Sequence, residues 1–397
     1  MSDDLFEELL ARPTGRAAVP TLNDDRDYTS SISISGNKVE LSINLPEGQA
    51  NEGTGLAFLE EEGLNPDEWE TTSFSKSRWG SEDKPMESVK FGYKRKATGS
   101  PLEVSMDDLI HAVNAFEYEG WEKALTERKA GDYGIVVGIG DMQFGKIDGD
   151  GPEGTLLRTL DVIGKIGIEL ERLRESYPYN HIHVVWLGDH VEGFVSQGGA
   201  NVWRTQLTLN EQIRLTRRVM MKMLETVAPL APRVSMAAVP GNHGEAVRFA
   251  GKGLTRYDDS HDTESLIAVS EAVTLAPEKF GHVEFYVPDT DELTIVTEVA
   301  NTVVLQAHGH MHAPGKHFDW WKGQAFHNPL AHRADVLMEG HLHHEEVDTD
   351  GYRTFIGVPA LESESTWWRH KTGTPGAPGA FIGVVKDGRM PVKHIIS

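Results

Sequence analysis

Five strand-like apolar runs in the sequence each end in residues of the types that bind metal ions. Residues that follow neighbouring strands gather at one edge of a sheet, so these side chains are expected to converge in space. Carboxylate oxygens, amide oxygens and imidazole nitrogens are suitable ligands for divalent cations. Such a cluster predicts a centre that holds two cations and activates water for hydrolysis. The runs end in Asp141 and Gln143, in Asp189, in Asn242 and His243, in His308, and in His341 and His343.

The absence of cysteine limits the chemistry of this centre. Thiolate zinc sites and disulfides are excluded, so any metal must be held by oxygen and imidazole ligands. Two divalent ions are expected, Mn²⁺ in first place, with Fe, Zn²⁺ or Mg²⁺ as alternatives. A carboxylate between two cations can bridge them, and paired sites of this kind lie about 3.5–4 Å apart.

The elements that position these residues follow an alternating pattern from Asp132 onward. Strand-like runs alternate with helical segments at about 154–176, 204–227 and 262–276, which predicts an α/β domain. After Pro288 the strand-like runs follow one another closely, and we expect them to form a second sheet stacked on the first and flanked by helices. These later runs are 293–299, 302–307, 335–339, 352–358, 380–385 and 391–396.

Residues 1–130 are predicted to form a small α+β accessory module with a linking helix, separate from a domain over residues 131–397. Residues 31–45 alternate apolar and polar positions, which predicts a hairpin that turns at Gly36 and Asn37. Ser105 is expected to cap the linking helix. The other predicted elements are a helix over 54–63, strands over 69–79 and 86–96, and the linking helix over 106–129.

The order of the five clusters resembles the calcineurin-like metallophosphoesterase family. The family pattern is DxH, GDxxD, GNH followed by an acid, a lone histidine, and then GHxH. The resemblance covers about residues 132–397 and implies a two-sheet β-sandwich flanked by helices. The matching segments are 140–143 (GDMQ), 188–192 (GDHVE), 241–245 (GNHGE), His308 and 340–343 (GHLH).

The resemblance also implies a role for each matched residue. Asp189 would bridge the two metals together with a hydroxide, which would attack phosphorus. His243 would contact the phosphate, where it would stabilise developing charge or protonate the leaving oxygen. The other ligands would be Asp141, Gln143 and His343 at the first metal position, and Asn242, His308 and His341 at the second.

The chain departs from the family pattern at three places. Gln143 stands where the pattern has histidine, and a neutral amide is a poorer ligand, which affects the affinity of the first metal. Glu192 stands where the pattern has aspartate, and Glu245 comes one residue late. A second run with GHxH spacing, 309–312, competes with 340–343. We prefer 340–343 because it follows the strand-like run VLMEG, so His310 and His312 are expected outside the ligand set.

The sequence is compatible with three functions. The first is a DNA exonuclease or endonuclease, because the pattern is similar to DNA-repair exonucleases of the Mre11/SbcD type and to phage-encoded relatives. Arg248 is then a candidate phosphate contact. The second is a phosphatase or phosphodiesterase acting on a small nucleotide or a phosphoprotein, which the net charge of -23 favours. The third is a metal-binding scaffold without catalysis, for which the replacement at Gln143 is the only support.

The expected partners follow from the first of these functions. DNA is the expected substrate, no membrane partner is expected, and a homodimer is the option for self-association. Basic and aromatic residues in strands 69–79 and 86–96 suit stacking on single-stranded nucleic acid. The same residues equally suit a small sheet that packs its aromatic side chains inward. The N-terminus lacks the basic start and apolar core of a signal peptide, so a cytoplasmic location is expected.

Overall fold

The chain forms two compact units, Met1–Leu102 and Glu103–Ser397, which are described separately below. None of the described helices is both long enough and apolar enough to cross a membrane. The structure, a computed structural model, describes residues 29–35, 38–46, 52–61, 64–66, 69–81, 84–95, 105–116, 131–194, 205–246, 248–249, 252–253, 255–363 and 376–397.

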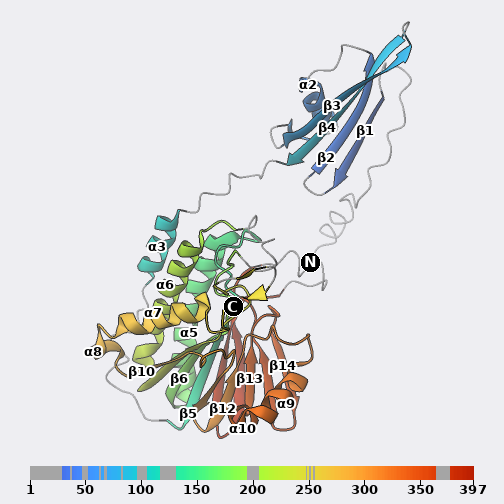
Figure 1. Cartoon of the computed structure of the whole chain (residues 1–397). Helices are drawn as coiled ribbons and strands as arrows, with labels where there is room; N and C mark the ends of the chain where they lie inside the picture. Colours follow the sequence, from blue (N-terminus) through green and yellow to red (C-terminus); the bar gives the residue numbers. More distant parts are fainter. Residues whose placement is uncertain are drawn as a thin grey trace, which may run out of the picture. The chain divides into compact units, whose positions relative to one another are not determined.

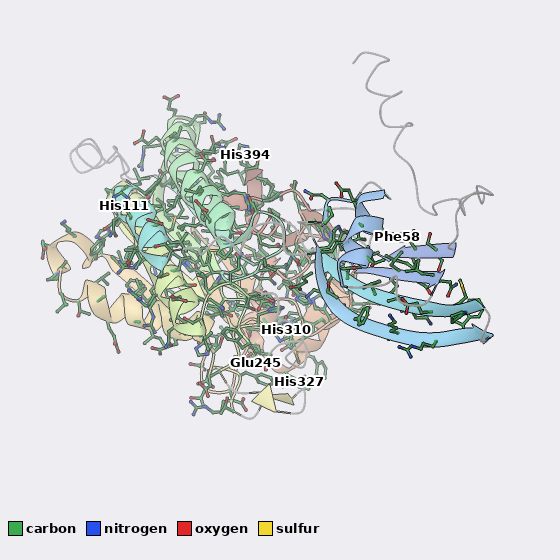
Figure 2. The ribbon with its side chains drawn as sticks, turned by 90° about the horizontal axis from the view of Figure 1, so that it is seen from above. Phe58, His111, Glu245, His310, His327 and His394 are labelled. Atoms are coloured by element: carbon green, nitrogen blue, oxygen red, sulfur yellow. The ribbon has the colours of Figure 1, made fainter. Side chains whose placement is uncertain are left out.

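The smaller unit is a four-stranded antiparallel sheet in the order β1-β2-β4-β3, with helix α2 packed on one face (Figure 1). Phe58 of α2 lies in the apolar core between the helix and the sheet (Figure 2). Trp69, Phe91 and Tyr93 are buried in the same core, so the sheet packs these aromatic side chains inward. The elements are β1 (Thr29–Ser35), β2 (Lys38–Pro46), α2 (Glu52–Glu61), β3 (Trp69–Ser81) and β4 (Lys84–Arg95).

The predicted hairpin is confirmed, because β1 and β2 are antiparallel and Ser35 pairs with Lys38. The turn residues Gly36 and Asn37 lie outside the described residues. Ser105 caps helix α3 (Met106–Ala115), since its side chain accepts a hydrogen bond of 3.3 Å from the backbone N–H of Asp108. Helix α3 ends before the predicted boundary, and residues 117–130 lie outside the described part of the chain.

The larger unit contains a six-stranded sheet in the order β10-β7-β6-β5-β16-β17 (Figure 1). Strands β10, β7, β6 and β5 run parallel, and every position of β5 and β6 except Tyr133 and Asn180 is buried, as expected for strands covered on both faces. Helices α3, α5, α6 and α7 share one apolar core with this sheet. The elements are β5 (Tyr133–Ile139), α5 (Gly151–Ser176), β6 (Tyr179–Trp186), α6 (Leu209–Val227), a 3₁₀ turn (Ala228–Leu230), β7 (Arg233–Ala238), β8 (Arg248–Phe249), β9 (Lys252–Gly253), α7 (His261–Val273), α8 (Pro277–Phe280), β10 (Val283–Tyr286), β16 (Ala380–Lys386) and β17 (Arg389–Ile396).

A second, five-stranded sheet in the order β11-β12-β13-β15-β14 stacks on the first. A second apolar core lies between the two sheets, and a third lies between the second sheet and helices α9 and α10. The predicted α/β class, with two stacked sheets flanked by helices, is therefore confirmed. The elements are β11 (Ile295–Val299), β12 (Thr302–Gln306), α9 (His317–His327), α10 (Pro329–Arg333), β13 (Val336–Glu339), β14 (Glu346–Asp350) and β15 (Arg353–Gly357).

One strand pair lies in a different sheet from the one expected. Strands β16 and β17 were predicted with the second sheet, but β16 pairs antiparallel with β5 of the first sheet. The side chains explain this position: Ile382 and Val384 face the core beneath the helices, whereas Phe381 and Val385 face the core between the sheets. A strand that is apolar on both faces is most stable when both faces are covered.

A polar network is buried between the two sheets, on the sides of β6 and β7 that face β11 and β12. The hydroxyl of Ser235 lies 2.7 Å from His181 Nε2 and 2.8 Å from His183 Nδ1. On its other side, His183 Nε2 lies 3.0 Å from Gln306 Nε2 and 3.2 Å from Thr297 Oγ1. Burial lowers the pKa of His181 to about 3 and the pKa of His183 to about 4, so both imidazoles are neutral in the folded protein at pH 7.

We expect the free energy of unfolding to fall as the pH is lowered from about 6.5 to about 4, because unfolded histidine binds a proton with a pKa of about 6.5 while folded His183 does not. The loss attributable to His183 is expected to reach about 3 kcal/mol at the lower end. Denaturant unfolding of wild type and His183→Gln across this range measures it, with exposed His327→Gln as the control. A variant whose stability falls with pH as steeply as wild type contradicts the assignment.

Candidate metal centre

The strands end level with one another, and this brings the five clusters to one edge of the two sheets. In the first sheet Ile139 pairs with Trp186, and Trp186 pairs with Ala238, so the residues after β5, β6 and β7 start side by side. In the second sheet β12 and β13 are parallel, and the N–H of Gly340 donates to the carbonyl of His308 at 3.0 Å. The expected convergence is therefore present in the fold.

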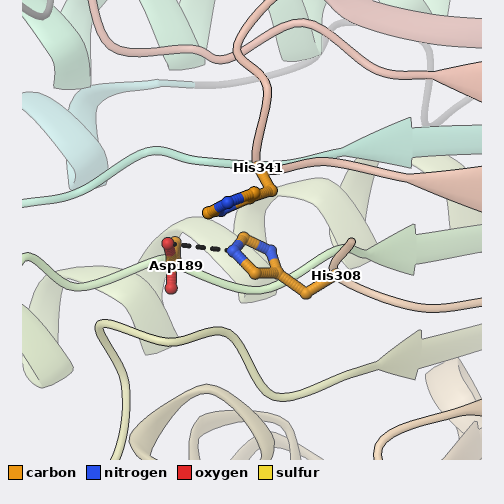
Figure 3. A group of neighbouring side chains, drawn as sticks. All are labelled: Asp189, His308 and His341. Carbon is orange, nitrogen blue, oxygen red and sulfur yellow. Dashed lines mark ion pairs between the residues drawn. The ribbon is translucent and has the colours of Figure 1, made fainter. Parts of the chain in front are cut away.

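Asp189, His308 and His341 meet at the second metal position (Figure 3). One ligand atom from each lies within 4.8 Å of the others, and His308 Nε2 lies 3.0 Å from Asp189 Oδ2. His308 Nδ1 lies 2.6 Å from the carbonyl oxygen of Leu187, which fixes the ring with Nε2 directed at Asp189. This is the arrangement expected of an imidazole that is held ready to bind a cation.

Several buried ligand atoms in this region make no hydrogen bond with suitable geometry to any described residue. They include Asp141 Oδ1, Asn242 Oδ1 and His308 Nε2. Two of these atoms have ion-pair contacts that lack hydrogen-bond geometry, Asp141 with His343 and His308 with Asp189. Buried polar atoms nearly always make hydrogen bonds, so these atoms need a further partner. A divalent cation would provide one, and two imidazoles, a carboxylate and an amide oxygen suit it.

The ionisable side chains at the second metal position shift one another's pKa values. Burial opposes ionisation, but the imidazoles of His308 and His243 hold the pKa of Asp189 well below its usual range. Burial disfavours the protonated imidazole of His308, but Asp189 raises the pKa of His308 to about 10. Burial, together with the neighbouring His308, lowers the pKa of His341 to about 4. Opposed shifts among touching groups in one cluster are typical of functional sites.

Backbone strain is concentrated at the same residues. A positive φ is unfavourable for residues with a side chain and costs on the order of 1–3 kcal/mol each, and it persists where the surrounding structure enforces it, often at functional sites. Five of the seven predicted ligands adopt it: Asp141 (φ 51°), Gln143 (44°), Asp189 (54°), His341 (65°) and His343 (58°).

At the first metal position the protein side chains contact one another in a continuous series. His343 Nε2 lies 3.1 Å from Asp141 Oδ1, and His343 Nδ1 lies 2.9 Å from Glu362 Oε1. Lys146 Nζ donates a hydrogen bond of 2.9 Å to Gln143 Oε1 and lies 3.2 Å from Glu362 Oε2. The sequence pattern gave no indication of Glu362 or Lys146, because neither belongs to a motif.

His243 lies next to the second metal position, with its ring between Asp189 and Glu192. Its backbone N–H donates to Asp189 Oδ1 at 2.7 Å, while its Nε2 is 4.0 Å from Asp189 Oδ2. Its Nδ1 lies 3.1 Å from the carbonyl oxygen of Glu192 and 3.3 Å from Glu192 Oε2. Burial opposes protonation, yet Asp189 and Glu192 raise the pKa of His243 to about 9, so the ring can carry a proton at neutral pH.

Asp262, at the start of α7, holds two of the ligand loops together. Its carboxylate accepts hydrogen bonds from the backbone N–H groups of Asp189 (3.1 Å), His190 (2.9 Å) and Gly241 (2.9 Å). The loops approach so closely that a Cβ on Gly241 would lie 2.1 Å from Asp189 Oδ1, which explains the glycine of the GNH segment. Sequence reasoning missed Asp262, since it is 73 residues from Asp189.

Replacing Asp262 with alanine is expected to lower the free energy of unfolding by at least about 3 kcal/mol, because three buried N–H groups lose a charged acceptor. The Asp189 loop is expected to lose its position, so Mn²⁺ affinity should fall as well. Thermal unfolding and calorimetric metal titration measure the two effects. Asp262→Asn, which keeps an acceptor oxygen, should lose less of both, and an alanine variant as stable as wild type would show that Asp262 has no such role.

Two further histidines of the sequence motifs, His310 and His312, lie beside the ligand cluster. His310 packs beside it, with its ring centroid 5.3 Å from that of His308 and 6.2 Å from that of His341 (Figure 2). His312 pairs with Glu339 at 2.8 Å. Arg248 is in the short strand β8, but its side chain lies outside the described part of the structure.

No protein-family model matches the chain, and no curated protein matches it. Solved structures with a similar course of the chain include a predicted phosphoesterase from Streptococcus pneumoniae (14% identity, 64% of this chain and 84% of that chain covered, TM-score 0.27). Vps29 complexed with Zn²⁺ from Entamoeba histolytica is another (14% identity, coverage 66% and 99%, TM-score 0.29). A third is an archaeal phosphodiesterase (11% identity, coverage 66% and 99%, TM-score 0.29).

Proposed function

We propose that this chain is a metal-dependent phosphoesterase of the calcineurin-like type, which hydrolyses phosphodiester bonds. The observation that carries the proposal is the convergence of Asp189, His308 and His341, whose ligand atoms lie within 4.8 Å of one another. The order of the motifs supports the same conclusion, as do the buried side-chain atoms of Asn242 and His308 that make no hydrogen bond to a described residue. Mn²⁺ is the cation that we propose.

The residues divide the work between binding and proton transfer. Asp189, Asn242, His308 and His341 would hold a divalent cation, which supplies Lewis acidity and lowers the pKa of water. Glu192 keeps the ring of His243 in place and favours its protonated form. His243 can therefore stabilise negative charge on a phosphate oxygen and hold the proton that the leaving oxygen needs.

We propose DNA as the substrate, cleaved by an exonuclease or endonuclease activity. The support is the similarity of the motif order to DNA-repair and phage-encoded exonucleases. The buried Trp69, Phe91 and Tyr93 of the smaller unit are not available for base stacking and add no support, whereas Phe74 and Trp79 of β3 are exposed and remain available for it. A small nucleotide or a phosphoprotein is the second candidate, and the net charge of -23 favours it because an acidic protein repels a polyanion.

The substrate class is tested with the purified full chain and Mn²⁺, with chelator in parallel. Linear single-stranded DNA, linear double-stranded DNA, mononucleotides and bis-p-nitrophenyl phosphate are the substrates. We expect metal-dependent loss of DNA and a steep decrease of DNA binding with salt. Cleavage of the small substrates alone would favour the second candidate. Binding of Mn²⁺ without any hydrolysis would identify a metal-binding scaffold.

A further inference from the structure

We propose that the ammonium group of Lys146 takes the place of the first metal, so that the centre binds one divalent cation tightly instead of two. This inference rests on the proposed function, because it concerns the same centre. The tight cation is assigned to the second position, formed by Asp189, Asn242, His308 and His341. The first position, formed by Asp141, Gln143 and His343, then carries a cation that belongs to the protein.

The local fold directs Lys146 back onto the residue that replaces the family histidine. The N–H of Lys146 donates to the carbonyl of Gln143 at 3.1 Å, which closes a tight turn. Gly145 has a φ of 109° within this turn, a conformation that glycine adopts without strain. The side chain of Lys146 is only 11% exposed, and its Nζ reaches Gln143 Oε1 at 2.9 Å and Glu362 Oε2 at 3.2 Å.

The contact of Lys146 with Gln143 competes directly with a metal at the first position. The amide oxygen is the only good ligand atom of Gln143, and it already accepts a hydrogen bond from a cation. An ammonium group and a divalent ion that share one oxygen repel each other, and the repulsion is strong where little water screens it. An imidazole at position 143 has no such acceptor oxygen, so the glutamine and the lysine form a matched pair.

The balance of buried charge supports the same assignment. Asp141, Asp189 and Glu362 are buried carboxylates whose oxygens contact the side chains of the proposed ligands or belong to them. One ammonium group and one divalent cation together neutralise these three negative charges, and the buried carboxylate of Asp262 adds a fourth, which backbone N–H groups of the ligand loops stabilise. A second divalent cation would leave an excess of positive charge in a buried site, which is unfavourable unless further anions enter.

The test is a Mn²⁺ titration of the chelator-stripped full chain, followed by calorimetry and by elemental analysis after dialysis. Wild type is expected to bind one equivalent tightly. The double variant Lys146→Met with Gln143→His is expected to bind two, with the affinity for the second raised about tenfold or more. Lys165→Met removes an exposed lysine of α5 and should leave one equivalent. Lys146→Arg keeps the charge and should also leave one.

Two equivalents of similar affinity in wild type would overturn the proposal, as would a folded double variant that still binds one. Circular dichroism and thermal unfolding report whether the variants fold. If they do not, electron paramagnetic resonance of Mn²⁺-loaded wild type decides: isolated ions support the proposal, and an exchange-coupled pair overturns it. Hydrolysis is measured separately. One bound equivalent of Mn²⁺ without hydrolysis would contradict the proposed function alone. Two bound equivalents with hydrolysis would contradict this inference alone.

Discussion

Asp189→Asn is expected to abolish tight Mn²⁺ binding and to lower turnover of a phosphodiester substrate by roughly 10³-fold or more. Lewis-acid stabilisation of the transition state is worth several kcal/mol, and each ~1.4 kcal/mol changes a rate by about tenfold. Asp189 is the carboxylate of the second metal position, where it lies 3.0 Å from His308. Asparagine keeps the shape of the side chain but removes the charge that attracts a cation.

The effect of Asp189→Asn must be separated from a loss of folding. Asp262 holds the backbone of residue 189, and the N–H of His243 can still donate to the amide oxygen of the asparagine. The variant should therefore keep its fold, although the loss of the ion pair between Asp189 and His308 lowers its unfolding temperature below that of the metal-free wild type. Asp161→Asn, on the exposed face of α5, is the matched control and should behave as wild type. Unchanged metal stoichiometry in Asp189→Asn would remove Asp189 from the ligand set.

His243→Ala is expected to lower turnover by about 10²–10⁴-fold, the usual contribution of a positioned acid or base. Metal binding should be retained, because the imidazole of His243 is not one of the proposed ligands. Its Nε2 lies 4.0 Å from Asp189 Oδ2, and its Nδ1 contacts Glu192. The alanine variant also keeps the backbone N–H that donates to Asp189. Single-turnover kinetics and elemental analysis of the same sample measure both quantities, with the exposed His327→Ala as control.

Two results would contradict the role assigned to His243. A fall in metal content in parallel with turnover would place His243 among the ligands. Unchanged turnover would show that neither the charge nor the proton of its imidazole takes part in the rate-limiting step. Glu192→Gln should give a smaller loss than His243→Ala, since the carbonyl oxygen of Glu192 still contacts Nδ1 at 3.1 Å.

Much of the fold follows from local pattern. The apolar runs of β5, β6 and β7 and the long amphipathic helices α5 and α6 have signals that depend only on nearby residues. Helix α9 was not predicted, because its sequence HFDWWKGQAFH contains a glycine and no regular apolar stripe. It is stabilised by tertiary packing: Trp321 is buried against the second sheet, in one core with Leu305 and Phe355.

The sheet to which each strand belongs was harder to predict from the sequence than the strands themselves. The sequence places β16 and β17 directly after strands of the second sheet, so adjacency along the chain suggested the wrong sheet. The deciding factor is that β16 is apolar on both faces and pairs with β5, which precedes it by about 250 residues. A pairing of this separation leaves no local trace in a single sequence.

The residues of the candidate site also fall into two groups, those that the sequence predicted and those that it did not. The residues with recognisable spacing, such as Asp189, His308 and His341, converge as the strand-end rule predicts. The supporting residues Asp262, Glu362 and Lys146 reach the site from loops or a helix start, and no motif marks them. Among these, Lys146 changes the expectation most, because its contact with Gln143 gives a structural reason for the replaced histidine.

The most direct test of the central claim is hydrolysis of bis-p-nitrophenyl phosphate by the chelator-stripped full chain before and after addition of Mn²⁺. We predict no hydrolysis before addition, and restored hydrolysis once Mn²⁺ binds at the site of Asp189, His308 and His341. The restored activity should be absent from Asp189→Asn. A wild-type chain that binds Mn²⁺ at these residues, yet cleaves neither this diester nor DNA, would contradict the claim that the centre is catalytic.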